Sequence, residues 1–430
     1  MSDWREDILS DKVDLIHGHQ FRNYDFTEFG IPVVKIGQVK PEGLDLTDCS
    51  FVAYGREEEF QNEIIKNGDV LMALTGATLG KACLVKNLNG IVFQNYRVGR
   101  FEPKNKDADL DKTFLYYLMI EGKLLTQVFN KVNTGAQGNI GKSDFEKIKI
   151  KYPNVNVQKK IGSILITVDN VIEKTQSAIT KYKALKQGML HDLFTRGINL
   201  NTGKLRPRYE YAPELYKESK LGWIPRDWKC DLLENLTEKV GSGITPTGGS
   251  EVYQTQGILF LRSQNILSGK LLLDDVAFIS LEIDEMMANS RVKPFDVLLN
   301  ITGASIGRCA FYLEELGNAN VNQHVCIIRF KKQSKALAVF ASEYLNTDFG
   351  QRQMYKSMAV GNREGLNYQQ IKGFNFPDIR ELKELEKIAS IIESINNKLQ
   401  TEQTYLQKMQ QFKKGLMEDL LSGKKKCPDH

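Results

Sequence analysis

The chain has 430 residues, of which 41% are hydrophobic and 26% are charged, and its formal net charge is +5. This length exceeds one ordinary hydrophobic core, so we expect two or more domains, and the composition excludes a disordered chain. The small positive charge permits a nucleic-acid partner without requiring one. No apolar run approaches the roughly 20 residues that span a bilayer, and the N-terminus does not resemble a signal peptide, so we expect a cytoplasmic protein without membrane contact.

Residues 1–156 form the first predicted domain. Short apolar runs alternate there with Gly, Asn and Asp turns, as in DVLMAL from Asp69, which is typical of a β-rich domain. Residues 111–129 have a helical pattern and are expected to pack against the strands. Residues 157–195 contain no proline and repeat apolar positions at spacings near three and four, which predicts one long helix. Residues 196–225 hold prolines and no period, so they form a linker.

The second half of the chain repeats the first. A shift of 227 residues lays DVLMALTGATLGK (from Asp69) over DVLLNITGASIGR (from Asp296), and it places Lys35 over Arg262. A shift of 229 aligns VFQNYRVGRF (from Val92) with VNQHVCIIRF (from Val321), and a shift of 226 aligns TGAQGNI (134–140) with VGNREGL (360–366). We therefore expect a second β-rich domain at 226–382, a second long helix at 383–422 and a basic tail at 423–430.

Both predicted helices carry one apolar seam that is interrupted at the matched residues Thr175 and Glu402. A narrow seam over about five heptads favours pairing of the two helices with each other. The alternative is that each helix packs on its own β-rich domain. Because the repeated units imply a pseudo-two-fold axis, the pair is expected to be antiparallel, with the β-rich domains separated by the helices. The predicted fold is α+β, with an internal pseudo-two-fold duplication.

The sequence contains few signals for catalysis. The segment Gly76–Lys81 resembles the start of a P-loop, but three residues separate its glycines and Ala82 replaces the required Ser or Thr. The chain contains no Pro-Pro, which excludes the motif of adenine amino-methylation, and the scattered carboxylates and histidines form no nuclease or triad pattern. The six cysteines are scattered, so we expect reduced thiols, and His17-Gly-His19 is a polar loop in preference to a metal site. We expect no catalytic residue, no metal and no cofactor on this chain.

Polar residues near the repeated motifs are candidates for contact with DNA, because Arg, Lys, Asn and Gln form hydrogen bonds to base edges and phosphates. Any single one can equally be a turn residue or a solvated side chain. In the first half the candidates are Lys35, Gln38, Arg56, Thr75, Thr78, Lys81, Gln94, Asn95, Tyr96, Gln137 and Asn139. In the second half they are Arg262, Gln264, Asn265, Asn300, Thr302, Ser305, Arg308, Gln323, His324, Asn362 and Arg363.

Over essentially its whole length the chain resembles the specificity (S, HsdS) subunits of type I restriction-modification systems. The passage VQKKIGSILITVDNVIEKTQSAITKYKALKQGMLHDLFTRGI (from Val157), followed by NTGKLRP, resembles the central conserved region of that family. The segment from Leu385 resembles its C-terminal counterpart, and LGWIPRDW (from Leu221) with GITPTGG (from Gly243) resembles the entry to its second recognition domain. The first half departs from the pattern, because HGHQFRNYDF (from His17) stands where a G-x-TP segment is expected.

The resemblance implies two target-recognition domains, each recognising one half of a bipartite site in double-stranded DNA, with the helices as a spacer. It also implies two methyltransferase (M) subunits that bind S-adenosylmethionine, and restriction (R) subunits that use ATP and Mg, as partners. Two alternatives stay open from the sequence. One is the same fold in a type IIB-like system, whose partner joins methylation and cleavage, and the other is a P-loop nucleotide-binding enzyme.

Overall fold

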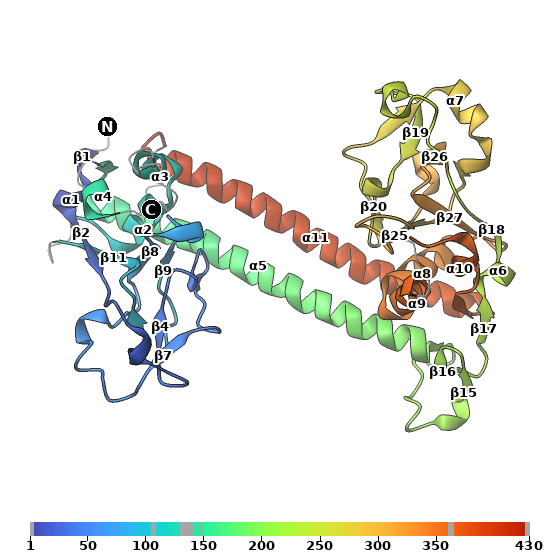
Figure 1. Ribbon diagram of the computed structural model, residues 1–430, viewed down its shortest axis with the longest axis horizontal. Helices are drawn as coiled ribbons and strands as arrows, with labels where there is room; N and C mark the ends of the chain where they lie inside the picture. The colour runs from blue at the N-terminus through green and yellow to red at the C-terminus, as the bar shows by residue number, and fades with distance from the viewer. Residues whose placement is uncertain (1–3, 105–108, 130–140, 146–147, 360–364, 426–430) are drawn as a thin grey trace. The chain divides into compact units, whose positions relative to one another are not determined.

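The computed structural model describes residues 4–104, 109–129, 141–145, 148–359 and 365–425 (Figure 1). The chain divides into two compact units. The first unit comprises Met1–Ala178 and Glu402–His430, and the second comprises Ile179–Thr401. Each unit therefore contains one β-rich domain and a part of both long helices.

The first unit is built around two four-stranded sheets, with strand orders β10-β4-β7-β3 and β2-β11-β8-β9. Its strands are β1 (Arg5–Ile8), β2 (Val13–His17), β3 (Phe26–Thr27), β4 (Ile31–Val34), β5 (Val39–Lys40), β6 (Gly43–Leu44), β7 (Ser50–Val52), β8 (Val70–Ala73), β9 (Ala82–Leu84), β10 (Phe93–Gln94), β11 (Val98–Pro103) and β12 (Lys149–Tyr152). Its short helices are α1 (Leu9–Lys12), α2 (Lys112–Ile120), α3 (Gly122–Phe129) and α4 (Lys142–Phe145).

The second unit also contains two four-stranded sheets, with orders β22-β19-β26-β23 and β18-β27-β24-β25. Its strands are β13 (Ile198–Asn199), β14 (Lys204–Leu205), β15 (Tyr216–Ser219), β16 (Gly222–Pro225), β17 (Lys229–Leu232), β18 (Thr237–Ser242), β19 (Ile258–Leu261), β20 (Ile266–Leu267), β21 (Lys270–Leu271), β22 (Ala277–Ile279), β23 (Arg291–Val292), β24 (Val297–Asn300), β25 (Cys309–Phe311), β26 (Ala319–Val321), β27 (Val325–Phe330) and β28 (Asn375–Asp378). Its short helices are α6 (Leu233–Leu236), α7 (Leu281–Met286), α8 (Lys335–Asn346), α9 (Asp348–Ala359) and α10 (Tyr368–Lys372).

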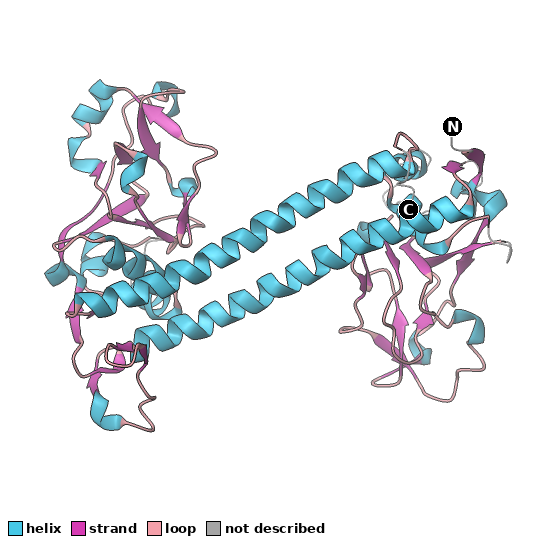
Figure 2. Cartoon of the chain, turned by 180° about the vertical axis from the view of Figure 1, so that it is seen from behind, coloured by secondary structure: helices cyan, strands magenta, loops and turns pink. Residues whose placement is uncertain are grey.

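The sheets of the two units share most of their strand pairings. The order β2-β11-β8-β9 has the same connectivity as β18-β27-β24-β25, and in both units the central pair is antiparallel. In the other sheet, β4 pairs in parallel with β10 as β19 does with β26. Figure 2 shows most strands of each unit gathered in its β-rich domain, whereas the short strands β13–β16 of the linker lie beside the end of α5 (Val155–Arg196). The predicted α+β fold with an internal duplication is confirmed.

The register of the strands corrects one alignment made from the sequence. Val98 lies opposite Ala73 in the first unit, and Val325 lies opposite Asn300 in the second, so both strands follow the 227-residue shift. The alignment of similar amino acids in this segment gave a shift of 229, and that shift is wrong by two residues. Hydrogen bonding defines the register of a strand, whereas sequence similarity over a short apolar segment does not.

The long helices are α5 (Val155–Arg196, 42 residues) and α11 (Leu382–Leu421, 40 residues). The Asn154 side chain accepts a hydrogen bond from the backbone N–H of Val157 at 3.1 Å, which caps the start of α5. In the first unit, Lys413 of α11 forms an ion pair at 2.6 Å with Asp169 of α5. In the second unit, the Lys398 ammonium lies 5.6 Å from the centre of the Tyr182 ring. Within each unit the packed helix segments are antiparallel.

The apolar seam differs from the predicted one in two respects. Ile161 and Leu165 share a core with Phe114 of the first β-rich domain as well as with Leu420, so the helices pack on the domains and on each other. The sequence also predicts Leu185 and the matched Phe412 as seam residues, because they continue the apolar period, but they are 56% and 55% exposed and this prediction is wrong. The two residues are related by the 227-residue shift, so both copies of the repeat expose the same position.

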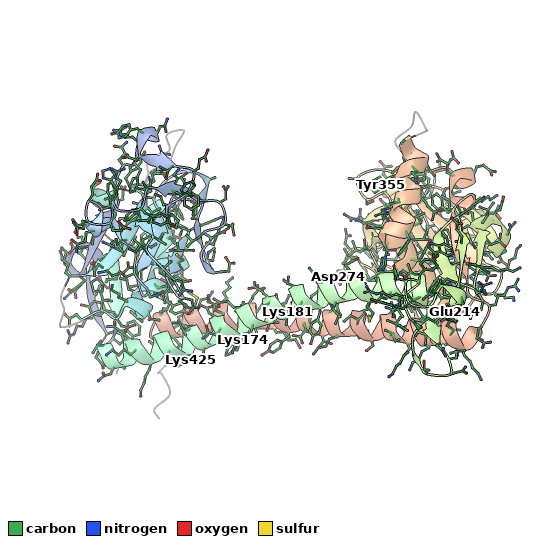
Figure 3. All side chains as sticks on the ribbon, turned by 90° about the horizontal axis from the view of Figure 1, so that it is seen from below. Lys174, Lys181, Glu214, Asp274, Tyr355 and Lys425 are labelled. Carbon is green, nitrogen blue, oxygen red and sulfur yellow. The ribbon has the colours of Figure 1, made fainter. Side chains whose placement is uncertain are left out.

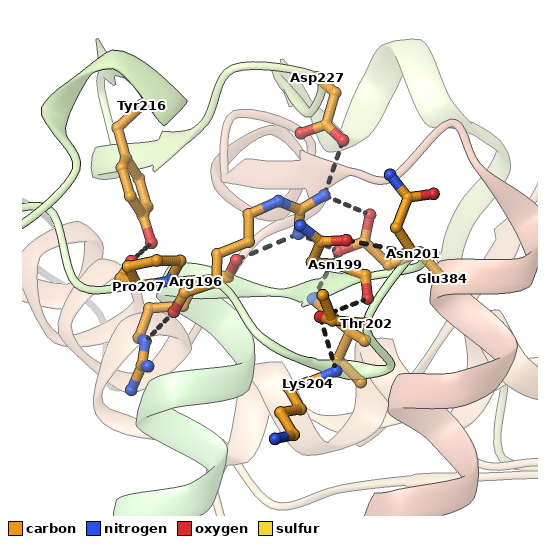
Figure 4. Close-up of polar contacts among 11 residues, drawn as sticks. Arg196, Asn199, Asn201, Thr202, Lys204, Pro207, Tyr216, Asp227 and Glu384 are labelled. Atoms are coloured by element: carbon orange, nitrogen blue, oxygen red, sulfur yellow. Dashed lines mark hydrogen bonds and ion pairs between the residues drawn. The ribbon is translucent and has the colours of Figure 1, made fainter.

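The linker after α5 is held in the second unit by polar contacts with the start of α11 (Figure 4). The Arg206 guanidinium contacts the buried Glu384 carboxylate through both of its terminal nitrogens, with Nη2 at 3.0 Å from Oε2. Arg206 Nη2 also donates to Asp227 at 2.7 Å, and Glu384 Oε1 accepts the backbone N–H of Ile198 at 2.8 Å. The end of α5 is thereby joined to the first turn of α11 by a clasp, which we define as Arg206, Glu384, Asp227 and the backbone around Ile198.

Among the described residues, no helix has both the length and the apolar character needed to cross a membrane. The five described cysteines are free thiols, as predicted, whereas Cys427 lies outside the described residues. Burial raises the pKa of the Cys83 thiol to about 12. Such a thiol stays protonated and behaves as a small apolar core residue.

Candidate nucleic-acid interface

The segment Gly76–Lys81, which resembles the start of a P-loop, lies in the loop between the adjacent strands β8 and β9. β8 ends at Ala73, a single 3-10 turn covers Gly76–Thr78, and β9 begins at Ala82. The Gly80 N–H donates to Ala73 O at 2.9 Å, and in the second unit Gly307 donates to Asn300 O at the same distance. A P-loop places its phosphate-binding turn at the start of a helix, so this strand–turn–strand geometry does not provide a phosphate cradle.

Gln38 and Asn265 hold equivalent turns together. The Gln38 side chain accepts the backbone N–H of Lys35 at 3.1 Å and donates to Asp48 O at 2.7 Å. Asn265 accepts the N–H of Arg262 at 3.0 Å and donates to Asp275 O at 2.7 Å. Asn265 also donates to Leu272 O at 3.0 Å, so both N–H groups of this fully buried amide are engaged inside the fold, whereas Gln38 is held in its turn by one accepted and one donated hydrogen bond.

Other candidates are also engaged inside the β-rich domains. Gln94 is fully buried and donates to Ile16 O and Val98 O at 2.9 and 2.8 Å. Asn300 is fully buried and donates to Ser263 O at 2.8 Å and to Ser305 Oγ at 3.0 Å. Buried amides of this kind fix the fold and cannot reach a base in a DNA groove.

Several other candidates have side-chain partners nearby. They are Thr78, which donates to Ile36 O at 3.2 Å; Lys35, which donates to Ser50 Oγ at 2.6 Å; Arg262, which contacts Asp275 at 3.5 Å; and Gln264, which donates to Asp275 at 2.8 Å. Arg56 pairs with Asp25 at 3.1 Å and with Glu59 at 2.7 Å. The backbone N–H of Arg22, followed by the Arg56 guanidinium, holds the pKa of the Asp25 carboxyl below its ordinary value.

A group of polar side chains remains at the surface of the second unit. The Thr302 hydroxyl lies 2.5 Å from His324 Nδ1, and the Gln323 amide nitrogen lies 3.1 Å from His324 Nε2. The Thr245 hydroxyl donates to Gln323 Oε1. These residues come from the loops after β18, β24 and β26, so the fold brings together segments that are distant in the sequence. We call Thr245, Thr302, Gln323 and His324 the second polar network.

The first unit has a corresponding group on the same loops. Arg97 Nε donates to the Tyr96 hydroxyl at 2.7 Å, and the Arg97 guanidinium carbon lies 5.3 Å from the centre of the Tyr96 ring. His17 Nδ1 lies 3.3 Å from the backbone oxygen of Tyr96. Thr75 Oγ1 is buried and has no hydrogen-bond partner within the described chain. The structure therefore brings Tyr96 and Thr75 into one neighbourhood, with Arg97 in addition.

Arg97 and Thr245 were missed by the sequence reasoning. The 229-residue shift paired Arg97 with Cys326, a core residue, whereas the 227-residue register pairs it with His324. The correct shift would have placed two polar residues at the same exposed loop position. Thr245 was overlooked because the first unit contains no segment similar in sequence to GITPT (from Gly243).

The unmatched segment after His17 follows the same path as its counterpart. A Cβ atom on Gly18 would lie 2.0 Å from Gln94 O, and one on Gly243 would lie 1.6 Å from Val321 O. Both glycines therefore permit the same close approach of backbone to backbone. The segment that follows is two residues longer in the second unit. His17 (opposite Gly99) matches Ser242 (opposite Cys326), which is a shift of 225. Thr27 (opposite Phe51) matches Gln254 (opposite Phe278), which is again a shift of 227.

The remaining candidates are less constrained. Lys81 and Arg308 are exposed, and their side chains make no hydrogen bond or ion pair with the described residues. Asn95 and its match Asn322 accept backbone N–H groups in the turns that precede β11 and β27. Gln137, Asn139, Asn362 and Arg363 lie outside the described residues. Within the described part of the chain, no group of His, Cys, Asp and Glu side chains is arranged to hold a metal ion.

Comparisons with known proteins agree with this architecture. A family profile described as Type I restriction modification DNA specificity domain matches residues 1–181. The putative type I restriction enzyme MjaX specificity subunit of Methanocaldococcus jannaschii is 22% identical over 98% of this chain and 93% of its own length. The MjaVIII specificity subunit of the same organism is 24% identical over 84% of this chain and 80% of its own length. Residues 1–181 match a type I restriction-modification specificity domain, and the chain is similar over most of its length to type I specificity subunits.

Solved structures support the fold of a specificity subunit. The S subunit of a type I restriction-modification system from M. genitalium has a TM-score of 0.63 at 15% identity, covering 100% of this chain and 97% of that chain. A chain from a structure concerned with complex assembly and conformational transition of the type I R-M system has a TM-score of 0.53 at 13% identity, covering 97% of both chains. At these identities the likeness concerns the fold alone.

Proposed function

We propose that this chain is the DNA-recognition subunit of a type I restriction-modification complex, in which each unit recognises one half of a bipartite site in double-stranded DNA. One observation carries the proposal. The two β-rich domains share the strand pairings of their common sheets and the buried turn asparagines Asn95 and Asn322, and they differ in the exposed polar side chains of matched loops. A duplicated scaffold with different surface chemistry is what recognition of two different half-sites requires.

The long helices fit the role of a spacer and a docking surface for two M subunits. Lys181 and Leu185 are exposed on α5, and the matched residues Lys408 and Phe412 are exposed on α11; Lys181 is labelled in Figure 3. The first pair lies in the second unit and the second pair in the first unit. One cation and one apolar side chain, repeated at the same spacing, would offer the same contact to two copies of one partner.

In this complex the catalytic steps belong to the partner subunits. The M subunits would bind S-adenosylmethionine and methylate adenine, and R subunits would use ATP and Mg to cleave DNA. This chain would contribute recognition and assembly, in the cytoplasm, and no catalytic residue or cofactor site.

The direct test is to express this chain with its M subunit in a host that lacks adenine methylation, and to map methylated adenines across the genome. We expect one bipartite motif with a fixed spacer. Expression of the M subunit alone is the control and should give no such motif. Methylation without a bipartite motif, or a motif that does not depend on this chain, would contradict the proposal.

A further inference from the structure

The loop between β10 and β11 and its match between β26 and β27 have one backbone design and different exposed side chains. Asn95 Oδ1 accepts the N–H of Arg97 at 3.3 Å, and Asn322 Oδ1 accepts the N–H of His324 at 3.1 Å. The buried asparagine is therefore kept, and the next two residues change from Tyr96-Arg97 to Gln323-His324. A loop of constant shape that exchanges only its outward side chains is suited to distinguishing one ligand from another.

The Gln323 amide is oriented by its neighbours. Its oxygen accepts from the Thr245 hydroxyl, so its nitrogen faces His324. An amide nitrogen only donates, and therefore His324 Nε2 accepts and His324 Nδ1 carries the proton toward Thr302 Oγ1, 2.5 Å away. With one donor and one lone pair engaged, the exposed amide keeps one N–H and one lone pair that make no hydrogen bond with the described residues.

One remaining donor beside one remaining acceptor is the pattern that adenine satisfies in the major groove. Adenine presents the N7 acceptor and the N6 amino donor there, and Gln binds these two groups together. Neither phosphate nor sugar offers such an adjacent donor–acceptor pair. The fixed orientation of Gln323 favours adenine over the other bases, since the amide cannot rotate without breaking its contacts with Thr245 and His324.

The matched position in the first unit has different chemistry. Arg97 is exposed, and only its Nε is engaged, by the Tyr96 hydroxyl at 2.7 Å. Its two terminal nitrogens make no hydrogen bond or ion pair with the described residues. A guanidinium with two free donors binds O6 and N7 of guanine.

Resting on the proposed function, we propose that Gln323 specifies an adenine in one half-site and that Arg97 specifies a guanine in the other. Thr245, Thr302 and His324 are positioning residues that hold the Gln323 amide. The same loop position in the two units thus determines one base of each half-site.

The test uses the full chain assembled with its M subunits and a pool of DNA duplexes randomised in one half-site at a time. Bound duplexes are sequenced for the parent and for the Gln323→Glu and Arg97→Gln variants. Gln323→Glu should lose the preference for adenine at one position of the second half-site, by roughly ten-fold to a hundred-fold, in favour of cytosine, whose amino group a carboxylate accepts. Arg97→Gln should change guanine to adenine at one position of the first half-site.

Gln256→Glu is the matched control, because Gln256 is exposed in the same unit and outside the second polar network. It should leave both half-sites unchanged. An unchanged adenine preference in Gln323→Glu overturns the inference, and so does an equal loss at every position of the half-site, which would indicate a structural role. Absence of any bipartite preference in the parent complex would instead contradict the proposed function.

Discussion

Glu384 is 1% exposed and carries a charge, so its environment must replace the water it has lost. The Arg206 guanidinium and the backbone N–H of Ile198 do so with hydrogen bonds to both carboxylate oxygens. A buried ion pair adds little net stability when intact, because desolvation offsets the attraction, but removing one partner leaves a buried charge unpaired. Asp227 contacts the same guanidinium from a side chain that is 59% exposed, where water screens the interaction.

At the residue scale we therefore predict unequal effects within the clasp. Glu384→Gln should lower the free energy of unfolding by about 3 kcal/mol, since Arg206 is left buried without its main counter-charge. Asp227→Asn is the matched control and should change it by less than about 1 kcal/mol. Urea denaturation of the full chain measures both values. Equal losses in the two variants would show that burial does not determine the worth of these carboxylates.

The candidate site shows what the sequence reveals about single residues. Gln38, Gln94, Asn265 and Asn300 have the right chemistry for DNA contact, but their amides bind backbone atoms of neighbouring strands and turns. Residue type indicates what a side chain can bind, and only the fold determines whether that capacity is already used. Position relative to the sheet decides which amide is exposed. Gln323 lies in the loop after a strand and is exposed, whereas Gln94 lies within a strand and is buried.

At the scale of elements, the long helices and the β-rich texture were predictable because each follows from a period in the sequence. Strand register was less accessible. Sequence similarity aligned the segment around Arg97 with the wrong residues of the second unit. Apolar residues in strands replace one another freely, so similarity does not reveal the register that the hydrogen bonds define. The exposed Leu185 and Phe412 continue the helical period without belonging to the packed seam, so periodicity alone overestimates what is buried.

The close backbone approaches at Gly18 and Gly243 allow a prediction for the ends of β2 and β18. Gly243→Ala should lower the free energy of unfolding by about 3 kcal/mol, because the new methyl group would meet Val321 O at 1.6 Å. Gly18→Ala should have a similar effect in the first unit. Gly241→Ala is the control, since a Cβ atom there meets nothing within 4 Å.

Thermal unfolding of the four proteins, parent included, measures the difference. Limited proteolysis should place the damage of each glycine variant in its own unit. If Gly243→Ala and Gly241→Ala shift the melting temperature equally, the backbone contact at Val321 does not constrain this position.

At the scale of the whole molecule, the duplication was visible in the sequence because its copies keep both order and spacing. The division into units was not visible, since the expected boundaries separated the helices from the domains, whereas each compact unit includes helix segments from distant parts of the chain. A core shared by residues such as Ile161 and Leu420 unites parts of the chain that no local pattern relates.

The matched exposed positions on α5 and α11 predict the stoichiometry of assembly. Leu185→Glu should remove one M subunit from the complex, Phe412→Glu should remove the other, and the double variant should bind none, because a carboxylate replaces an apolar contact at each position. Native mass spectrometry of complexes assembled with excess M subunit counts the copies. Gln187→Glu, also exposed on α5, should retain two. Two copies on Leu185→Glu would contradict docking at this surface.

The composition of the first unit has a consequence for synthesis. Its core includes Leu420 and Leu421 together with Leu9 and Ile161, so this unit lacks part of its interior until the end of α11 has been made, after the whole second unit. The second unit is continuous from Ile179 to Thr401 and can complete its core earlier. Because domains ordinarily fold from the N-terminus onward, this chain should reverse the usual order, and its first half should depend longest on protection from aggregation.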